Sequence, residues 1–155
     1  LRARKHTFDP QALEPGVNPL ANLSVDLHET RIDVNPGSAS ALRLSVGGVD
    51  VIYAAAAREL ICKKHRAPLR PRDGRVSLRV LVDRTSIEIF GNEGEVYMPV
   101  YRPPELSGTR SVGLLAEGGA ARVRSLEVNE LESIWFQAQE GTAGSAAAAS
   151  GPTIR

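Results

Sequence analysis

The sequence predicts an all-β fold, a sandwich of two antiparallel sheets of the lectin-like (concanavalin, jelly-roll) type. Short stretches in which apolar and polar residues alternate recur at intervals of roughly ten residues, which is typical of half-buried strands. Clusters of Gly, Pro, Asn and Asp separate these stretches and provide turns. About nine to twelve short strands follow, without a secure helix, and this pattern favours a two-sheet sandwich.

The clearest strand pattern spans residues 74–101. Every second residue from Val76 to Val82 is a branched aliphatic one, which predicts a strand with one buried face. A turn at residues 83–86 and a second turn at 91–94, where Gly and Asn tolerate positive φ, divide the rest into two further strands. The segment therefore predicts an antiparallel meander of three strands.

The N-terminal half gives a less continuous pattern. Residues 1–20 contain three prolines and are expected to be a connector, because this composition resists helices and interior strands. Alternation begins near Asn22 and continues to Val34, with His28 expected on the polar face. Residues 41–46 and 49–53 are predicted to pair through a two-residue hairpin at Gly47 and Gly48.

Residues 54–64 give conflicting signals. Four alanines followed by Arg, Glu and Leu favour a short helix on intrinsic propensity. The segment is nevertheless short for a stable helix and has strands on both sides, so a strand is predicted. The basic residues between positions 63 and 75 are interpreted as a solvated loop rather than a polyanion site, because no aromatic residues lie among them.

The C-terminal third is predicted to contain a short strand at 112–116, a hairpin turn at 117–119 and a last strand at 122–131. Trp135 and Phe136 are expected to anchor the core. The Gly-, Ala- and Ser-rich tail has no large side chain to bury and is predicted to be disordered. The predicted organisation is thus a connector at 1–20, a sandwich at 21–136 and a tail at 137–155.

Composition excludes several classes of protein. The chain has 155 residues and a net charge of +1, so no strong field would collect nucleic acid or an anionic membrane. No apolar run approaches the ~20 residues of a membrane span. The single Cys62 is expected to be a buried packing residue, and the three histidines lack metal-ligand spacing, so neither a metal nor a cofactor is predicted. Localisation is not predicted, since the first residues lack both Met and an apolar segment.

Residues 78–98, LRVLVDRTSIEIFGNEGEVYM, resemble the most recognisable segment of the C-terminal β-sandwich module of glycoside hydrolase family 32, the family of invertases, inulinases and levanases. Weaker similarity reaches from about residue 10 to 136. The motif residues that carry the resemblance are Asp83, Arg84, Glu88, Phe90 and Gly94. In this family the catalytic acids belong to an N-terminal five-bladed propeller, so the resemblance implies a module that accompanies a catalytic partner.

The family's catalytic motifs have no counterpart here. Arg72 and Asp73 are followed by Gly rather than by the Pro of the family's Arg-Asp-Pro motif, and Glu59 is not adjacent to Cys62 as in its Glu-Cys motif. Glycoside hydrolysis needs two carboxyl groups about 5 Å or roughly 6.5–9.5 Å apart. The acids at 83, 88, 93 and 95 are expected at turns or solvated positions, so no catalytic residue is predicted.

Two functions remain open. One is a non-catalytic module that supports a catalytic propeller of a fructan or sucrose hydrolase and contributes to contacts between copies of the chain. The other is a stand-alone, lectin-like carbohydrate-binding module, for which Tyr97 and Tyr101 are the candidate sugar-binding residues. A low aromatic content of 5% counts against the second function.

Overall fold

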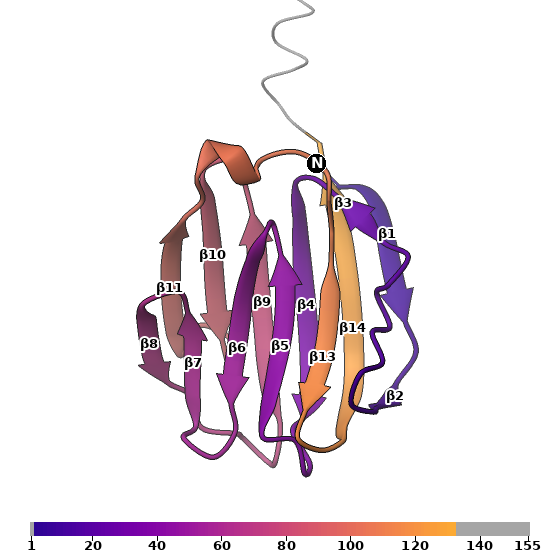
Figure 1. Ribbon diagram of the computed structural model, residues 1–155, viewed down its shortest axis with the longest axis vertical. Coiled ribbons are helices and arrows are strands. Elements are labelled where there is room, and N and C mark those ends of the chain that lie inside the picture. Colours follow the sequence, from indigo (N-terminus) through magenta and orange to yellow (C-terminus); the bar gives the residue numbers. More distant parts are fainter. Residues whose placement is uncertain (1, 133–155) are drawn as a thin grey trace, which may run out of the picture.

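The computed structural model describes residues 2–132, and they form two antiparallel sheets packed face to face, as the sequence predicts (Figure 1). The described residues contain no α-helix and one short 3₁₀ turn, η1 (Pro104–Leu106). The strands are β1 (Arg2–Phe8), β2 (Gln11–Leu13), β3 (Ser24–Val25), β4 (His28–Asn35), β5 (Ala41–Val46), β6 (Val49–Ala54), β7 (Glu59–Cys62), β8 (His65–Pro68), β9 (Val76–Val82), β10 (Ser86–Gly91), β11 (Val96–Tyr101), β12 (Arg110–Ser111), β13 (Gly113–Glu117) and β14 (Ala121–Leu131).

The larger sheet has seven strands in the order β1-β14-β4-β9-β10-β11, and β2 also pairs with β14. The smaller sheet has five strands in the order β13-β5-β6-β7-β8. A two-stranded sheet of β3 and β12 lies at one end of the sandwich (Figure 1). The meander β9-β10-β11 has the predicted register, with Ile89 opposite Val80 on one side and Met98 on the other.

The core lies between the two sheets and consists of the inward residues of each strand. Every second residue of β9, from Val76 to Val82, is buried, as the alternation predicts. The side chains of Tyr53 and Cys62 point into the core from the five-stranded sheet. Cys62 is fully buried, as expected. Burial raises the pKa of the Cys62 thiol, which makes a packing role more favourable than a reactive one.

Both predicted turns of the meander and the two-residue hairpin are present. Gly47 and Gly48 have φ values of 58° and 79°, the mirror-image turn that suits the twist of a hairpin. Residues 54–64 consist of the end of β6, a turn and β7, so the strand prediction is correct for Glu59–Cys62 and the helix is absent. Asn92 adopts positive φ in the turn before β11.

Four sequence-based expectations differ from the structure. The expected loop at residues 63–75 includes strand β8, which pairs with β7. Residues 1–20 contain β1 and β2, which pair with β14; the prolines lie between and after these two strands, where they remove no hydrogen bond from the sheet. His28 is fully buried rather than on the polar face, because a bend at residues 26–27 shifts the alternation by one residue.

The fourth difference concerns residues 117–119, which do not form a hairpin. β13 pairs with β5 in the small sheet and β14 pairs with β4 in the large one, so this segment crosses between sheets. A Cβ atom at Gly119 would lie 2.2 Å from the Ser38 carbonyl oxygen. The glycine is therefore needed for close approach to the turn at residues 36–40, a requirement that local sequence does not reveal. Predictions for Trp135, Phe136 and the tail at 137–155 lie outside the described residues.

Candidate functional site

The five motif residues lie along two turns and the outer side of β10. Asp83 and Arg84 form the turn between β9 and β10, where the Asp83 carboxylate accepts a hydrogen bond from the Arg84 backbone N–H at 2.7 Å. Glu88 and Phe90 point outward from the seven-stranded sheet. Gly94 has a φ of 95°, and a Cβ atom added to it would meet no atom within 4 Å, so it serves the turn through its backbone freedom alone.

Three aromatic side chains form a strip on the outer side of the seven-stranded sheet, which we call the aromatic strip: Phe90, Tyr97 and Tyr101. The Phe90 and Tyr97 rings lie 5.1 Å apart at a tilt of 32°. Tyr97 and Tyr101 are 52% and 64% exposed, which leaves their rings accessible to a ligand. The Tyr97 hydroxyl donates to Glu88 Oε1 at 2.6 Å, and this bond raises the pKa of Tyr97.

A charged cluster continues the same face toward the middle of the sheet. The Arg79 guanidinium lies 5.3 Å from the centre of the Phe90 ring and also pairs with Glu29. Glu29 is buried and accepts a hydrogen bond from Arg31 as well. Burial alone would raise the pKa of Glu29, but the two arginines outweigh it and the pKa is lowered. A general acid needs a shift in the opposite direction.

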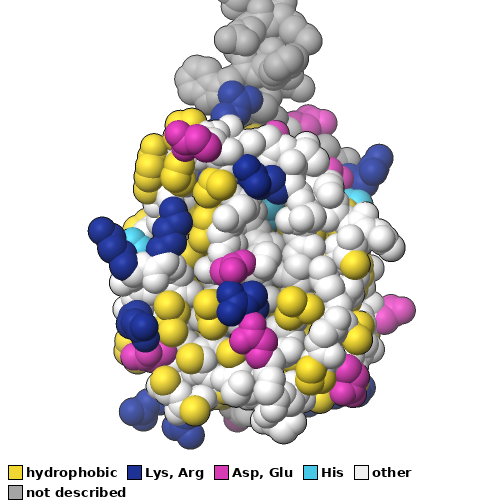
Figure 2. Space-filling model, in the orientation of Figure 1, with side chains coloured by type: hydrophobic (Ala, Val, Ile, Leu, Met, Phe, Trp, Pro, Cys, Tyr) yellow, Lys and Arg dark blue, Asp and Glu magenta, His cyan; other side chains and the backbone are white. Residues whose placement is uncertain are grey.

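The outer side of the five-stranded sheet carries a row of aliphatic residues, Ile52, Ile61 and Leu115, which we call the aliphatic face. Strand register places them in one line across four strands, with Arg43 between Leu115 and Ile52. All three are half-buried. Figure 2 shows this side of the molecule, where hydrophobic side chains spread around a compact group of charges.

Arg43 is held in the middle of the aliphatic face by two acids. Its Nε donates to Glu117 at 2.7 Å and its NH1 group donates to Asp50 at 2.9 Å. These bonds, first that of Glu117 and then that of Asp50, raise the pKa of Arg43. The Arg43 charge is thus paired within the face, beside the three aliphatic side chains.

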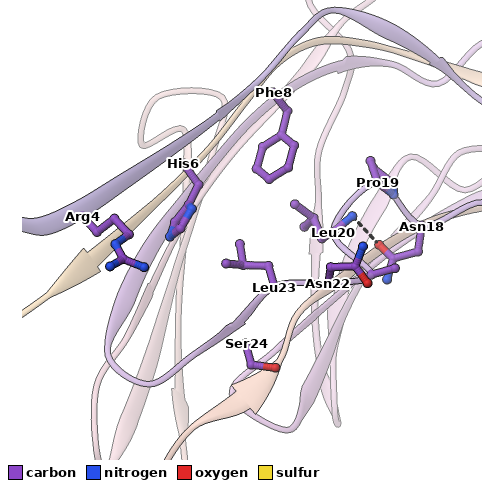
Figure 3. A pocket seen from close by; sticks show the side chains of 10 residues that line it. Arg4, His6, Phe8, Asn18, Pro19, Leu20, Asn22, Leu23 and Ser24 are labelled. Carbon is purple, nitrogen blue, oxygen red and sulfur yellow. Dashed lines mark hydrogen bonds between the residues drawn. The ribbon is translucent and has the colours of Figure 1, made fainter.

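An open groove of about 640 Å³ lies between β1 and the loop before β3, and we call it the N-terminal groove. Arg4, His6 and Phe8 form one wall from β1, and residues 18–24 form the other (Figure 3). His6 Nε2 lies 3.0 Å from Glu130 Oε2. No acidic residue lines this groove among the described residues. A second, smaller cavity of about 160 Å³ lies beside the β10–β11 turn.

Both arginines of the smaller cavity are paired with acids. It is lined by Asp33, Arg72, Asp73, Arg75, Ser77, Asn92 and Glu93. Arg75 pairs with Asp33 at 3.2 Å, and Arg72 pairs with Glu95 at 2.9 Å. Across residues 2–132 there is no group of three or more His, Cys, Asp or Glu side chains that could hold a metal ion.

Arg102 and Asn92 organise the loops that carry these surfaces, and the sequence analysis did not single out either role. Arg102 is fully buried and donates to the carbonyls of Gly47, Asp83 and Leu106 at 3.1, 2.8 and 2.6 Å. Asn92 accepts from the Ser77 N–H and donates to the Arg70 carbonyl. Most of their partners are backbone groups distant in sequence, so no local pattern signals them.

The two packed antiparallel sheets place the chain in the class of β-sandwich domains. The family model "Glycosyl hydrolases family 32 C terminal" matches residues 27–130, which is more than half of the chain. The chain therefore belongs to the C-terminal domain family of glycosyl hydrolases family 32. No helix of the described residues is long and apolar enough to cross a membrane.

Two curated relatives are levanases. The chain is 42% identical over 78 residues to a levanase of Bacillus sp. (strain L7), a match that covers 50% of this chain and 8% of the relative. It is 39% identical over 72 residues to the levanase of Bacillus subtilis (strain 168), covering 46% and 10%. The chain thus matches only about a tenth of the length of these relatives.

Solved structures share the fold. The exo-inulinase of Aspergillus awamori aligns with a TM-score of 0.64 at 18% identity, covering 86% of this chain and 30% of that one. The carbohydrate-binding module CBM66 of Bacillus subtilis aligns with a TM-score of 0.59 at 9% identity, covering 72% and 80%. At these identities the likeness concerns the fold alone.

Proposed function

We propose that this chain is the non-catalytic module of an enzyme that hydrolyses β-fructofuranosides such as fructans or sucrose, and that it supports the catalytic propeller by packing against it. The observation that carries the proposal is the aliphatic face. An antiparallel sheet with one face in water normally alternates apolar inward and polar outward residues. In the five-stranded sheet, Ile52, Ile61 and Leu115 occupy outward positions.

The charge distribution suits the aliphatic face to a protein partner. The Arg43 charge is satisfied within the face by Glu117 and Asp50. A partner would therefore cover aliphatic surface without leaving a buried charge unpaired, which is the main cost of docking onto charged residues. Contacts between copies of the chain would use the same surface.

The proposed division of labour is supported by the chemistry of the N-terminal groove and of Glu29. Hydrolysis of a glycosidic bond needs one carboxyl group with a raised pKa near a second carboxylate. The lining of the N-terminal groove contains no carboxylate, and the pKa of Glu29 on the outer side of the seven-stranded sheet is lowered. The levanase relatives are roughly ten times longer than their match to this chain, which is consistent with catalytic residues located elsewhere in such enzymes.

The proposal is tested by mixing the purified chain with a separately expressed family 32 propeller and measuring association by isothermal titration calorimetry. We expect binding that is lost in the double variant Ile52→Thr and Leu115→Thr. Threonine is β-branched and suits a strand, so this variant removes apolar surface and keeps the strand propensity. Tyr101→Thr, on the other sheet, is the matched control and should bind normally. Association that survives the double variant but is lost in the control would place the contact on the other sheet and contradict the proposal.

A second function, binding of carbohydrate, is favoured by one observation. Phe90 and Glu88 hold the Tyr97 ring in place, as a ring that stacks on a sugar needs to be, and Tyr101 lies further along the same strand. Saturable heat on titration with a fructo-oligosaccharide, reduced in Tyr97→Ala or Tyr101→Ala, would support this alternative. Unchanged binding in both variants would exclude the strip as the sugar site.

A further inference from the structure

The N-terminal groove has an apolar floor between its two walls. Phe8 and Leu23 are half-buried and Leu20 is 1% exposed, so the floor is made of side chains that belong partly to the core. The Phe8 ring projects from β1 toward the side of the groove that carries Leu20 and Leu23 (Figure 3). A floor that combines an aromatic ring with aliphatic side chains suits the C–H face of a sugar ring.

The rim of the groove carries polar groups of mixed character. Arg4, Asn22 and Ser24 are exposed and offer guanidinium, amide and hydroxyl groups. Together they supply hydrogen-bond donors and acceptors. The hydroxyl groups of a sugar both donate and accept hydrogen bonds, so they can bond to either kind of group. Arg4 and Asn22 lie on opposite walls (Figure 3), so a ligand in the groove would be contacted from two sides.

Charge in the groove is balanced. Glu130 of the neighbouring strand β14 has its Oε2 atom 3.0 Å from His6 Nε2 and 3.9 Å from Arg4 Nε. The carboxylate offsets the positive charge of the wall, so the groove has no strong attraction for a phosphate or a polyanion. A neutral ligand rich in hydroxyl groups fits these surroundings better than an anion.

The loop that forms the second wall is fixed before any ligand binds. Asn18 Oδ1 accepts hydrogen bonds from the backbone N–H groups of Leu20 at 2.9 Å and Leu114 at 3.0 Å. The Val112 N–H donates to the Leu23 carbonyl at 3.2 Å, which ties the loop to the segment before β13. A preformed site avoids the entropic cost of ordering a loop on binding.

From these observations we propose that the N-terminal groove binds a short neutral saccharide, with one sugar ring over Phe8 and its hydroxyl groups at Arg4 and Asn22. The groove volume of about 640 Å³ falls within the range of roughly 300–1,000 Å³ that is usual for small-molecule sites. All lining residues precede residue 27, where the family match begins. The site lies outside the segment that the family model matches, and it goes beyond the proposed docking role.

The test is a titration of the ¹⁵N-labelled chain with sucrose, 1-kestose and maltotriose, followed by NMR. We expect saturable shifts of backbone amides within residues 4–24 for at least one of these sugars. The double variant Arg4→Ala and Asn22→Ala should weaken binding by about tenfold or more. Both side chains are exposed, so its melting temperature should match that of the control Arg70→Ala, which removes an exposed arginine outside the groove and should bind normally.

Each alternative result overturns the proposal. Absence of saturable shifts with all three sugars would do so, and so would shifts confined to β10 and β11 that vanish in Tyr97→Ala, since these assign binding to the aromatic strip. Equal binding by the double variant and the control would also contradict it. Docking to a propeller through the aliphatic face is measured without sugar and on another sheet, so failure of one proposal leaves the other testable.

Discussion

Arg102 shows how much of this fold depends on one side chain. Its guanidinium joins three loops by bonds to the carbonyls of Gly47, Asp83 and Leu106, and it is fully buried. We predict that Arg102→Met lowers the free energy of unfolding by about 3 kcal/mol or more, because three carbonyls lose a charged donor. Urea denaturation measures this, with exposed Arg70→Met as the control. A loss equal to that of the control would show that these three bonds are dispensable.

The lowered pKa of the buried His28 leads us to predict that stability depends on pH. Burial lowers its pKa; the neighbouring Arg102 acts in the same direction, whereas the Asp26 carbonyl, the Asp26 carboxylate and Glu130 oppose it. The unfolded chain, with a histidine pKa of about 6.5, therefore binds a proton more readily than the folded chain. Stability should fall as pH drops below about 6.5, with a slope of at most about 1.4 kcal/mol per pH unit from this residue.

The contribution of His28 is isolated by comparing variants. His28→Gln, which cannot become charged, should remove this part of the slope when unfolding free energy is measured between neutral and mildly acidic pH. His65→Gln removes an exposed histidine from β8 and serves as the control. If the slope of His28→Gln equals that of the unchanged protein, the buried histidine is not the source of the acid sensitivity.

At the level of elements, a comparison of two glycines distinguishes the cost of backbone strain from the cost of a steric clash. Gly47 and Gly94 both have positive φ, but only at Gly47 would a Cβ meet other atoms, with Val82 Cγ1 at 2.8 Å and Arg102 Nε at 3.2 Å. We predict that Gly94→Ala costs about 1 kcal/mol and Gly47→Ala about 2–4 kcal/mol. Thermal denaturation of the two variants checks the order, and equal costs would contradict the close packing of the hairpin on Arg102.

β1 offers a second test at this scale. It pairs with β14 along residues Arg4 to Phe8, and it forms one wall of the N-terminal groove. We predict that removing residues 1–9 lowers the melting temperature by several degrees, because β14 loses its edge partner and its backbone groups become solvated. An unchanged melting temperature would mean that these residues act only as a connector, as the composition of the segment indicates.

The meander illustrates what sequence could predict. Alternation from Val76 to Val82 and the turn residues at 91–94 are local signals, so both the strands and their register follow from them. The crossing at 117–119 could not be predicted, because its glycines are required by contact with the turn around Ser38, far away in the chain. The prediction for His28 was wrong for a related reason: one bend reverses the faces of the residues that follow it.

Among surface residues, too, some positions follow from the local sequence and others depend on distant contacts. Tyr97 and Tyr101, the candidate sugar-binding residues, are exposed by the alternation of β11, and their sugar-binding role stays a prediction. The N-terminal groove was not foreseen. Arg4 and Asn22 line the same groove only because β1 pairs with β14 while Asn18 ties the following loop to Leu114. Surfaces built by distant pairing leave no pattern in the local sequence.

Considered as a whole, the molecule presents two unlike sheet surfaces. The aliphatic face combines aliphatic side chains with the paired charges of Arg43, Asp50 and Glu117, whereas the outer side of the seven-stranded sheet carries the Arg79 and Glu29 cluster and the aromatic strip. We predict that the isolated chain self-associates as its concentration rises, measured by sedimentation velocity, because apolar surface seeks a partner. The Ile52→Thr and Leu115→Thr variant should remain monomeric; equal self-association would place the contact elsewhere.

The most direct test of the central claim is the lifetime of a partner's activity. A family 32 propeller expressed alone is incubated at elevated temperature with and without this chain, and the half-life of its fructan-hydrolysing activity is measured. We predict a longer half-life with the chain present, an effect that is lost with Ile52→Thr and Leu115→Thr, while the chain alone releases no reducing sugar. An unchanged half-life at saturating concentrations of the chain would contradict a supporting role.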